Sequence, residues 1–597
     1  MTATHTDFRP RFGTLLDIFE QARATHGDRP LFGTKRSGGW SWVSHVEFAD
    51  AVDRARGGLA RLGVAAGDRV ALISDNRTEW AIAAYAAYGL GAAVVPMYEA
   101  QRDDNWRYIL DDSGAVAVFV ADGAIAERVA AFRSDLPELA NVIVFEGEGG
   151  DTSLAALEAD GAAHPVAPAD VTGADVAGFV YTSGTTGRPK GVVLTHANIA
   201  SNVSAVTEVF PVEPDDRTLS ILPWAHSFGQ TVELHLLLAT GASTAFAQSP
   251  RTVTSDLVEV APTMLVSVPR IFNGVHDGVT KRMSDAGGLT QLLFRRAMAN
   301  ADRRRELATD GRRSAILDAQ HKVFDRLVFS KVRANMGGRL KYAISGGAAI
   351  SVEVASFIDN LGIQVYEGYG LSETSPIATA NWPGSRRIGS VGKPIPGVRI
   401  ELDERADDEG AGEIVVHGHC VMQGYFNLPE ANAEVFTDDG GFRTGDLGRI
   451  DDDGFLWIIG RVKEQYKLEN GKYVVPTPLE DRIALSPYIA SALVVGANRP
   501  HNVALVVLDD EAVRAWAERE GVTGDLATIR DDPRLRELIG SEIAERLSEV
   551  NRYEQVRGFD ILPEDFTVEN GMLTPTLKVK RSVVAERYGD TIDGLYA

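Results

Sequence analysis

Residues 181–191 (YTSGTTGRPKG) are a string of small, hydroxyl-bearing and glycine residues between two apolar segments. Such residues let the backbone curve around an anion and present N–H and O–H donors to it, while Lys190 adds a positive charge. The string therefore predicts a cradle for nucleotide phosphates. It differs from the P-loop pattern, in which Ser or Thr follows the lysine, because Gly191 follows Lys190 here. The predicted phosphate ligands are Thr182, Ser183, Gly184, Thr185, Thr186, Gly187 and Lys190.

Other side chains capable of chemistry recur in short, glycine-punctuated contexts further along the chain. They lie in LPWAHSFGQ (222–230), SGGA (345–348), YEGYGLSETSP (366–376), FRTGDLGRI (442–450), IIGRVKEQYK (458–467) and NGMLTPTLKVKR (570–581). Taken singly, each context is more often a turn or a solvated surface than a site. Trp224, in the first of these contexts, could either gate an apolar tunnel or pack in a core, and the sequence favours neither.

The elements that must position these side chains follow an α/β pattern. Apolar strand-like segments alternate with helical ones up to about residue 380, which predicts a large unit with mostly parallel strands. Residues 386–460 are rich in glycine and strand-like, as in an antiparallel sheet or small β-barrel. From residue 463 strand-like and helical segments alternate, which predicts a small α+β domain. We therefore expect domains at 1–462 and 463–597.

Composition limits the classes of function. At 597 residues the chain needs more than one core, and its net charge of -23 argues against nucleic acid as a partner. One cysteine and no signal-peptide pattern favour a reducing cytoplasm. No apolar run reaches the roughly 18 to 20 residues that span a bilayer, so any membrane contact is expected to be peripheral, at the inner face. A homodimer is one open alternative for the oligomeric state.

Residues 281–340 run against the acidic trend, with 14 Lys or Arg against 6 Asp or Glu. A solvated helical face explains this balance, and so does a surface for anionic lipid.

Read in order, the motifs resemble those of AMP-forming acyl-CoA synthetases, members of the adenylate-forming ligase superfamily. The resemblance spans nearly the whole chain and is strongest to the long-chain fatty acid CoA ligase branch, as in GRVKEQYKLENGKYVVP (460–476). It implies a large adenylate-forming domain and a small mobile C-terminal domain. The implied substrates are a fatty acid, ATP and coenzyme A.

The resemblance also implies roles for residues around the nucleotide. Tyr369 lies against adenine, Ser372 lies near the α-phosphate, and Glu373 holds Mg²⁺, with Thr182 as a second candidate ligand. One carboxylate is enough for a hard cation that also binds phosphates and water. The other residues that it assigns to the nucleotide are Gly346, Gly347, Ala348, Glu367, Gly368 and Gly370.

Towards the C-terminus, Asp446 and Arg461 match the family residues that bind the ribose hydroxyls. A carboxylate accepts two such hydroxyls, and arginine adds a fork of donors. Lys463 takes the hinge position between the domains, and Lys467 corresponds to a second lysine near the nucleotide or thiol site.

Lys578 takes the place of the lysine that contacts the α-phosphate during adenylation, although Thr576 and Leu577 replace the usual Ser-Gly before it and Lys580 stays an alternative. His226 is expected to line the acyl pocket beside the reacting carboxylate, together with Phe228.

The expected reaction converts a carboxylate to acyl-AMP and pyrophosphate and then passes the acyl group to the CoA thiol. It needs no protein nucleophile, in keeping with the absence of a GxSxG motif. The acid is expected to have a medium to long chain. The alternatives are a fatty acyl-AMP ligase that delivers to a carrier protein, a ligase for aryl or other acids, and a non-catalytic acyl or nucleotide sensor.

Overall fold

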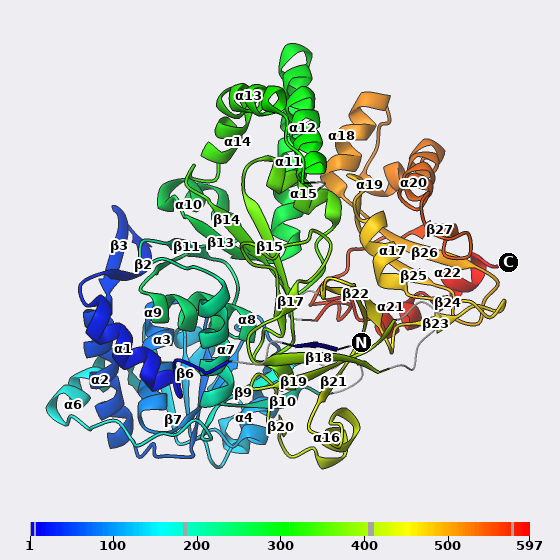
Figure 1. Ribbon diagram of the computed structural model, residues 1–597. Helices are drawn as coiled ribbons and strands as arrows, with labels where there is room; N and C mark the ends of the chain where they lie inside the picture. The colour runs from blue at the N-terminus through cyan, green and yellow to red at the C-terminus, as the bar shows by residue number, and fades with distance from the viewer. Residues whose placement is uncertain (1, 5–7, 183–187, 310, 404–410, 575–577) are drawn as a thin grey trace. The chain divides into compact units, whose positions relative to one another are not determined.

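The computed structural model describes residues 2–4, 8–182, 188–309, 311–403, 411–574 and 578–597 (Figure 1). The chain divides into two compact units. The first comprises residues 1–401, 415–444 and 450–457, and the second comprises residues 402–414, 445–449 and 458–597. The expected boundary between 1–462 and 463–597 stays a prediction.

One sheet of the first unit consists of β4 (Arg69–Ile73), β5 (Ala93–Met97), β6 (Ala117–Val120), β7 (Asn141–Val144), β8 (Thr152–Ser153), β9 (Val176–Thr182), β10 (Lys190–Thr195) and β20 (Gly424–Tyr425). Its order is β20-β10-β9-β5-β4-β6-β7-β8. The strands from β9 to β8 in this order pair in parallel, whereas β10 is antiparallel to both β9 and β20. The central strands are buried, as expected for parallel strands covered on both faces.

The helices that accompany this sheet are α1 (Leu15–His26), α2 (His45–Arg61), α3 (Thr78–Gly89), α4 (Asp103–Ser113), α5 (Gly123–Ala130), η1 (Arg133–Asp135), α6 (Leu154–Ala163) and α7 (His196–Val209). Helix α2 begins at a capping box between Ser44 and Glu47. It packs closely on α6, because a Cβ on Gly161 would lie 1.8 Å from the carbonyl oxygen of Arg54. Only glycine allows this approach.

Two smaller sheets complete the parallel part of the unit. The first has the order β11-β12-β2-β3, with β2 (Pro30–Arg36), β3 (Gly39–Ser44), β11 (Arg217–Ser220) and β12 (Ser243–Phe246). The second has the order β13-β14-β15-β16-β17, with β13 (Met264–Ser267), β14 (Tyr342–Ser345), β15 (Gln364–Tyr369), β16 (Thr379–Ala380) and β17 (Lys393–Pro394). Between β11 and β13 lie α8 (Ser227–Gly229), the π-helix η2 (Gln230–Leu236), α9 (Leu237–Thr240) and α10 (Val253–Val260).

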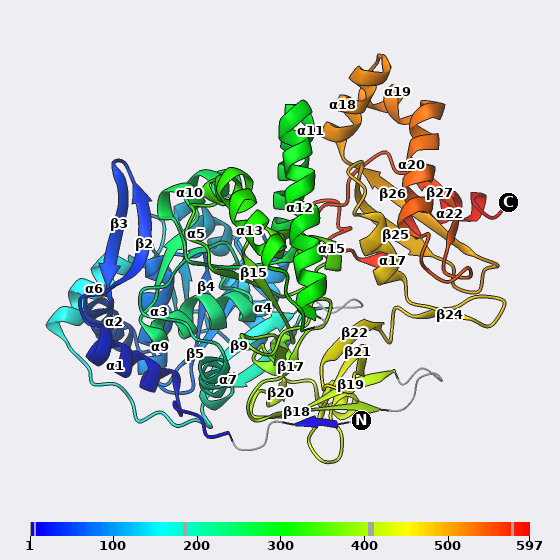
Figure 2. The same cartoon turned by 45° about the horizontal axis from the view of Figure 1, so that its top comes forward.

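A helical segment connects β13 to β14. It contains α11 (Pro269–Ala286), α12 (Gly288–Thr309), α13 (Ala315–Phe324), the π-helix η3 (Asp325–Phe329) and α14 (Ser330–Ala334), and α15 (Val352–Asn360) follows β14. Figures 1 and 2 show α11 and α12, in green, extending beyond the strands of this sheet. This segment holds the basic stretch 281–340.

The glycine-rich region and the N-terminal strand β1 form a further sheet of order β1-β18-β19-β21-β22, whose later strands carry residues of both units. Its strands are β1 (Thr2–Thr4), β18 (Val398–Asp403), β19 (Gly412–Gly418), β21 (Phe442–Ile450) and β22 (Leu456–Arg461), with η4 (Ser372–Thr374) and α16 (Pro429–Val435) nearby in sequence.

The second unit is an α+β fold, as the sequence predicts. The sheet β25-β26-β27 is built from β25 (Ile489–Val495), β26 (Asn502–Leu508) and β27 (Val556–Ile561), and β23 (Tyr466–Lys467) pairs with β24 (Tyr473–Val474). Its helices are α17 (Pro476–Ile483), α18 (Asp510–Glu520), α19 (Leu526–Arg530), α20 (Pro533–Arg546), α21 (Arg581–Arg587) and α22 (Gly589–Gly594). Buried residues such as Val506, Trp516 and Ile539 form its core. No helix among the described residues of the chain is long and apolar enough to cross a membrane.

Candidate active site

Lys190 and Glu373, far apart in sequence, lie near the same tyrosine. Lys190 opens β10, and Tyr425 on β20 pairs with the same strand at Val192. The Nζ atom of Lys190 lies 4.7 Å from the centre of the Tyr425 ring, and the Tyr425 hydroxyl donates to Oε1 of Glu373 at 2.9 Å. Burial and the Glu373 carboxylate raise the pKa of Tyr425, so its hydroxyl stays a donor. The structure thus brings a cation and a buried carboxylate to one aromatic ring.

Thr182 ends β9, directly opposite Lys190 in the antiparallel pair β9–β10. The predicted phosphate ligands Ser183, Gly184, Thr185, Thr186 and Gly187 lie outside the described residues. The two described ends of the predicted cradle are therefore held at one edge of a sheet.

The ends of β14 and β15 bring two of the glycine motifs together. These strands are parallel, with Ser345 opposite Glu367, so SGGA and the residues after Glu367 leave the same edge of the sheet. Clefts at the carboxyl ends of parallel strands are the usual ligand sites of open α/β sheets. Gly347 has a φ of +80°, which favours glycine. The other predicted nucleotide residues at this edge are Gly346, Ala348, Gly368, Tyr369 and Gly370.

Glu367 is buried at this edge. Burial raises the pKa of its carboxyl to about 8, against a smaller opposing effect from the backbone N–H of Ile350, which donates to Oε1 at 3.2 Å. Gly370 is required by close packing, because a Cβ there would lie 1.8 Å from the carbonyl oxygen of Pro376. These contacts fix the turn that carries Ser372 and Glu373.

The segment 222–230 reaches the same turn. The Oγ atoms of Ser227 and Ser372 are 3.0 Å apart, and both side chains are buried. His226 caps α8, with its Nδ1 accepting from the backbone N–H of Phe228 at 3.2 Å. A Cβ on Gly346 would lie 2.9 Å from the Phe228 ring, so ring and glycine fit closely. His226 and Phe228 thus lie beside the predicted nucleotide motifs.

A partly buried hydrogen-bond network holds the segment that leads to His226. Asn76 accepts from the backbone N–H of Trp224 at 2.7 Å and donates to Oγ of Ser220 at 2.8 Å. Ser220 in turn donates to Glu233, which is fully buried on the π-helix η2. Burial raises the pKa of Glu233 to about 8. The network holds the turn that carries His226, and π-helices are often found at functional sites.

Trp224 belongs to the core. Its side chain is 0% exposed, and its ring centre lies 5.5 Å from that of Trp80 and 5.3 Å from that of Phe246. Of the two interpretations that the sequence allows, the structure shows core packing.

The second unit holds the remaining predicted residues. Nε of Arg461 lies 3.0 Å from Oδ1 of Asp446, whose side chain is buried. Lys463 and Lys467 are exposed, and Nζ of Lys467 lies 5.4 Å from the ring centre of Tyr473. Asp446 and Arg461 thus form an ion pair, and their binding of the ribose stays a prediction.

Lys578 is exposed, and its backbone forms two hydrogen bonds with Thr574. Lys580 is half-buried and precedes α21. The two lysines lie on one short segment of the second unit.

Sequence reasoning missed Tyr425, Asn76, Ser220 and Glu233. Tyr425 lies in MQGYF (422–426), a glycine-containing context whose pattern carries no chemical signal. Glu233 could have been identified from its place in the apolar run TVELHLLL (231–238), because an acid that is buried in such a run needs a hydrogen-bonding partner.

Cys420 is fully buried, and burial raises the pKa of its thiol to about 12. Its carbonyl oxygen accepts from the hydroxyl of Ser375 at 2.7 Å. A thiol of this kind is inert, in keeping with a reaction that uses no protein nucleophile.

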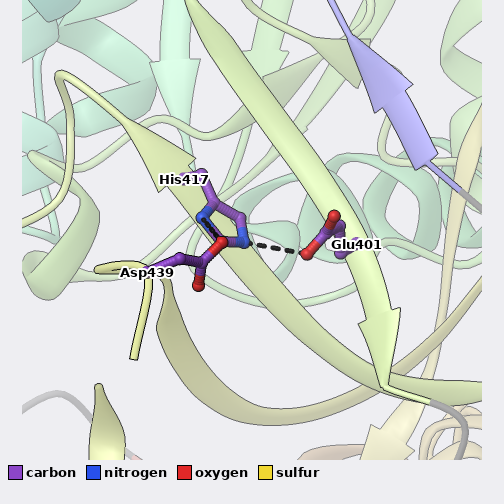
Figure 3. A group of neighbouring side chains, drawn as sticks. All are labelled: Glu401, His417 and Asp439. Carbon is purple, nitrogen blue, oxygen red and sulfur yellow. Dashed lines mark hydrogen bonds and ion pairs between the residues drawn. The ribbon is translucent and has the colours of Figure 1, made fainter. Parts of the chain in front are cut away.

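Glu401, His417 and Asp439 form a cluster whose residue types suit a metal ion (Figure 3). Nε2 of His417 lies 3.0 Å from Glu401, and its Nδ1 lies 3.7 Å from Asp439. The guanidinium of Arg399 contacts both carboxylates. Because this cation already compensates their charge, we interpret the cluster as an ion-pair network.

Comparison with known proteins gives matches along nearly the whole chain. Residues 18–426 match the family described as AMP-binding enzyme, and residues 463–597 match the AMP-binding enzyme C-terminal domain. A long-chain-fatty-acid–CoA ligase of Mycobacterium bovis is 38% identical, with 97% of this chain and 96% of the relative covered. Human long-chain-fatty-acid–CoA ligase 1 is 31% identical, with coverage of 98% and 86%.

Solved structures share the fold. The A-PCP didomain of carboxylic acid reductase from Segniliparus rugosus, in complex with AMP, superposes with a TM-score of 0.79 at 23% identity, covering 98% of this chain and 82% of that one. The anthranilate CoA ligase AuaEII in complex with anthranoyl-AMP gives a TM-score of 0.72 at 21% identity, with coverage of 97% and 98%.

Proposed function

Because this chain belongs to the AMP-binding enzyme family, we propose that it activates a medium- to long-chain fatty acid with ATP and transfers the acyl group to coenzyme A. The main support for this proposal is the contact of Tyr425 with both Lys190 and Glu373. Glu373 follows the ends of β14 and β15, where the two glycine motifs lie. The long-chain fatty acid specificity is supported by the names of relatives that are similar over their whole length.

In the first half-reaction, a carboxylate oxygen of the acid attacks the α-phosphorus of ATP. A bond forms between that oxygen and phosphorus, the bond to the β-phosphate oxygen breaks, and pyrophosphate leaves. Negative charge on the phosphates is stabilised by donors already held in place, a role that we assign to Lys190 and Lys578. Positioning of the acid is assigned to His226.

In the second half-reaction, the CoA thiolate attacks the acyl carbonyl carbon and AMP leaves. The thioester forms as the mixed anhydride bond breaks. Asp446 and Arg461 are proposed to hold the ribose, while Tyr369, Ser372 and the glycines of residues 346–370 hold adenine and the α-phosphate.

Glu373 fits a divalent cation. Its carboxylate is buried, it accepts a hydrogen bond from the neutral Tyr425 hydroxyl, and the ion pairs among the described residues include none to it. A buried carboxylate without a protein counter-charge is costly, and a cation on polyphosphate offsets that cost. When bound through Glu373 and Thr182, Mg²⁺ would neutralise charge on the phosphates.

Residues 463–597, the larger part of the second unit, are proposed to act as a mobile lid that is hinged at Lys463, with Lys467 near the nucleotide or thiol. The match of the same residues to a C-terminal domain family supports this division. The enzyme is proposed to act in the cytoplasm, with peripheral contact at the inner face of the membrane.

The test measures loss of the free CoA thiol with acids from acetate to stearate and with benzoate, beside exchange of labelled pyrophosphate into ATP. We expect exchange and CoA consumption, both greatest with medium to long chains. Exchange without CoA consumption would favour a fatty acyl-AMP ligase that uses a carrier protein. Absence of both would favour a non-catalytic sensor.

A further inference from the structure

The outer face of α13 and η3 presents large apolar side chains to solvent. Ile316, Val323 and Leu327 are 72%, 54% and 48% exposed and recur at the spacing of one helical face. At the start of α12, Leu289 and Leu292 are 70% and 45% exposed. Within the described part of the chain, five of the eleven exposed large hydrophobic residues thus lie between 289 and 327. Large apolar side chains that gather on the exposed face of one helix are typical of an interaction site.

Basic side chains flank this apolar stripe. Lys322, Arg326 and Lys331 are exposed, and no ion pair that the structure describes includes them. Acidic residues of the same segment are matched elsewhere, since Asp318 pairs with Arg304 at 2.7 Å and Asp325 pairs with Arg333 at 2.7 Å. The excess positive charge of residues 281–340 is therefore available at the surface.

The neighbours α12 and η3 are packed against the rest of the unit, whereas α13 itself has no buried residue. Phe294 and Ala301 of α12 are buried, and Phe329 of η3 is fully buried. The guanidinium of Arg305 donates to the side chain of Asn360 at 2.7 Å and to the carbonyl of Ser356 at 3.1 Å, both on α15. α13 is attached to α12 by the ion pair of Arg304 with Asp318 and by the side chain of Asn300, which donates to the carbonyl of Leu317 at 3.4 Å.

From these observations we infer that the α12–α13 face, defined by Leu289, Leu292, Ile316, Lys322, Val323, Arg326, Leu327 and Lys331, binds the surface of an anionic lipid bilayer. Helices that lie in a membrane interface combine an apolar stripe, which enters the acyl boundary, with basic residues at headgroup level. A chain with a net charge of -23 is repelled by anionic lipid over most of its surface, so a basic face also sets the orientation. The inference gives a location to the peripheral contact proposed above.

Flotation with vesicles of phosphatidylcholine, with and without phosphatidylglycerol, tests the proposal without any substrate. We expect the wild type to float with the anionic vesicles and to detach when NaCl rises from about 0.1 M to about 0.5 M, because salt screens the attraction. A triple variant, Lys322→Gln, Arg326→Gln and Lys331→Gln, should lose ~100-fold in partition coefficient, since each basic residue contributes about 5-fold. The triple variant Ile316→Ser, Val323→Ser and Leu327→Ser should lose at least ~10-fold.

Matched controls remove the same groups elsewhere. Arg9, Arg36 and Arg251 are exposed, and their change to Gln alters net charge equally. Val166, Val258 and Val583 are 37%, 49% and 37% exposed, and their change to Ser removes the same number of apolar side chains from other parts of the surface. Both controls should float as the wild type does. Wild type that stays with buffer at low salt, or α12–α13 variants that float like their controls, would overturn the proposal. Because no substrate is present, either result leaves the proposed ligase activity standing.

Discussion

Tyr425 joins two residues that the sequence motifs identify separately. It lies under Lys190 and donates to Glu373, so the position of the carboxylate depends on an aromatic side chain from a different strand. Glu373→Gln should reduce pyrophosphate exchange into ATP by ~10²- to 10³-fold, by analogy with the loss of one donor or charge at a transition state. A Mg²⁺ titration of the exchange rate measures this effect. Normal exchange by a folded Glu373→Gln variant would contradict the assignment of Glu373 as a metal ligand.

Tyr425→Phe tests how much the hydrogen bond that holds the Glu373 carboxylate contributes. It keeps the ring under Lys190 and removes one neutral hydrogen bond, whose net contribution is about 1 kcal/mol. We expect a loss of less than ~10-fold in exchange, mainly through a higher KM for Mg-ATP. A loss as large as that of Glu373→Gln would mean that the hydroxyl itself contacts the substrate.

Gly346→Ala tests the fit between the glycine turn and the proposed acyl site. The new methyl would lie 2.9 Å from the Phe228 ring, so the ring must shift at a cost of about 1 to 3 kcal/mol. We expect a higher KM for the acid with little change for ATP. Gly274→Ala is the matched control, because nothing lies within 4 Å of its Cβ and α11 should gain stability. Equal effects of both variants on KM would contradict the assignment.

The motif residues stand out in the sequence because their types and order carry the signal, whereas their roles at the site stay predictions. Glu373, Asp446 and Arg461 lie in ordered contexts, and the structure pairs the last two at 3.0 Å. Tyr425 and Asn76 could not be predicted, because each acts through a contact with a segment far away in the chain. Such contacts are decided by strand order, which local pattern does not specify.

Among the elements, the π-helix η2 buries an acid whose protonation is linked to folding. Burial raises the pKa of Glu233 from 4.5 to about 8. The folded state therefore keeps a proton that the unfolded state has lost, so stability falls as pH rises from about 4.5 to about 8. The free energy of unfolding of the wild type should decrease by about 2 kcal/mol more than that of Glu233→Gln between about pH 6 and pH 8. Chemical denaturation of both proteins at the two pH values measures it, and parallel pH profiles would contradict it.

The existence of elements was easier to predict than their pairing. The apolar runs at β4, β5 and β6 are strands as expected, and the alternating pattern after residue 463 is an α+β unit. The parallel pairing of β2 with β12, from opposite ends of a long stretch of chain, had no local signal. Likewise, the exposed stripe on α13 is visible only once its inner neighbours are known.

At the scale of the whole molecule, the proposed chemistry divides between the two units. Lys578→Ala should lower acyl-adenylate formation by ~10²- to 10³-fold, because it removes a cation from the developing charge. Synthetic acyl-adenylate plus CoA bypasses that step, so thioester formation should stay near the wild-type rate. Lys580→Ala is the control, and it should spare both steps. Equal loss in both half-reactions of Lys578→Ala would contradict the alternating use of the lid.

Cys420 has a consequence for measuring such alternation. Its thiol is fully buried and its pKa is about 12, so maleimide dyes should leave the native wild type unlabelled, as mass spectrometry can check. A cysteine introduced at an exposed position of each unit would then be the only group to react, with no need to replace Cys420. Two dyes attached to such cysteines would report the distance between the two units during turnover by fluorescence energy transfer.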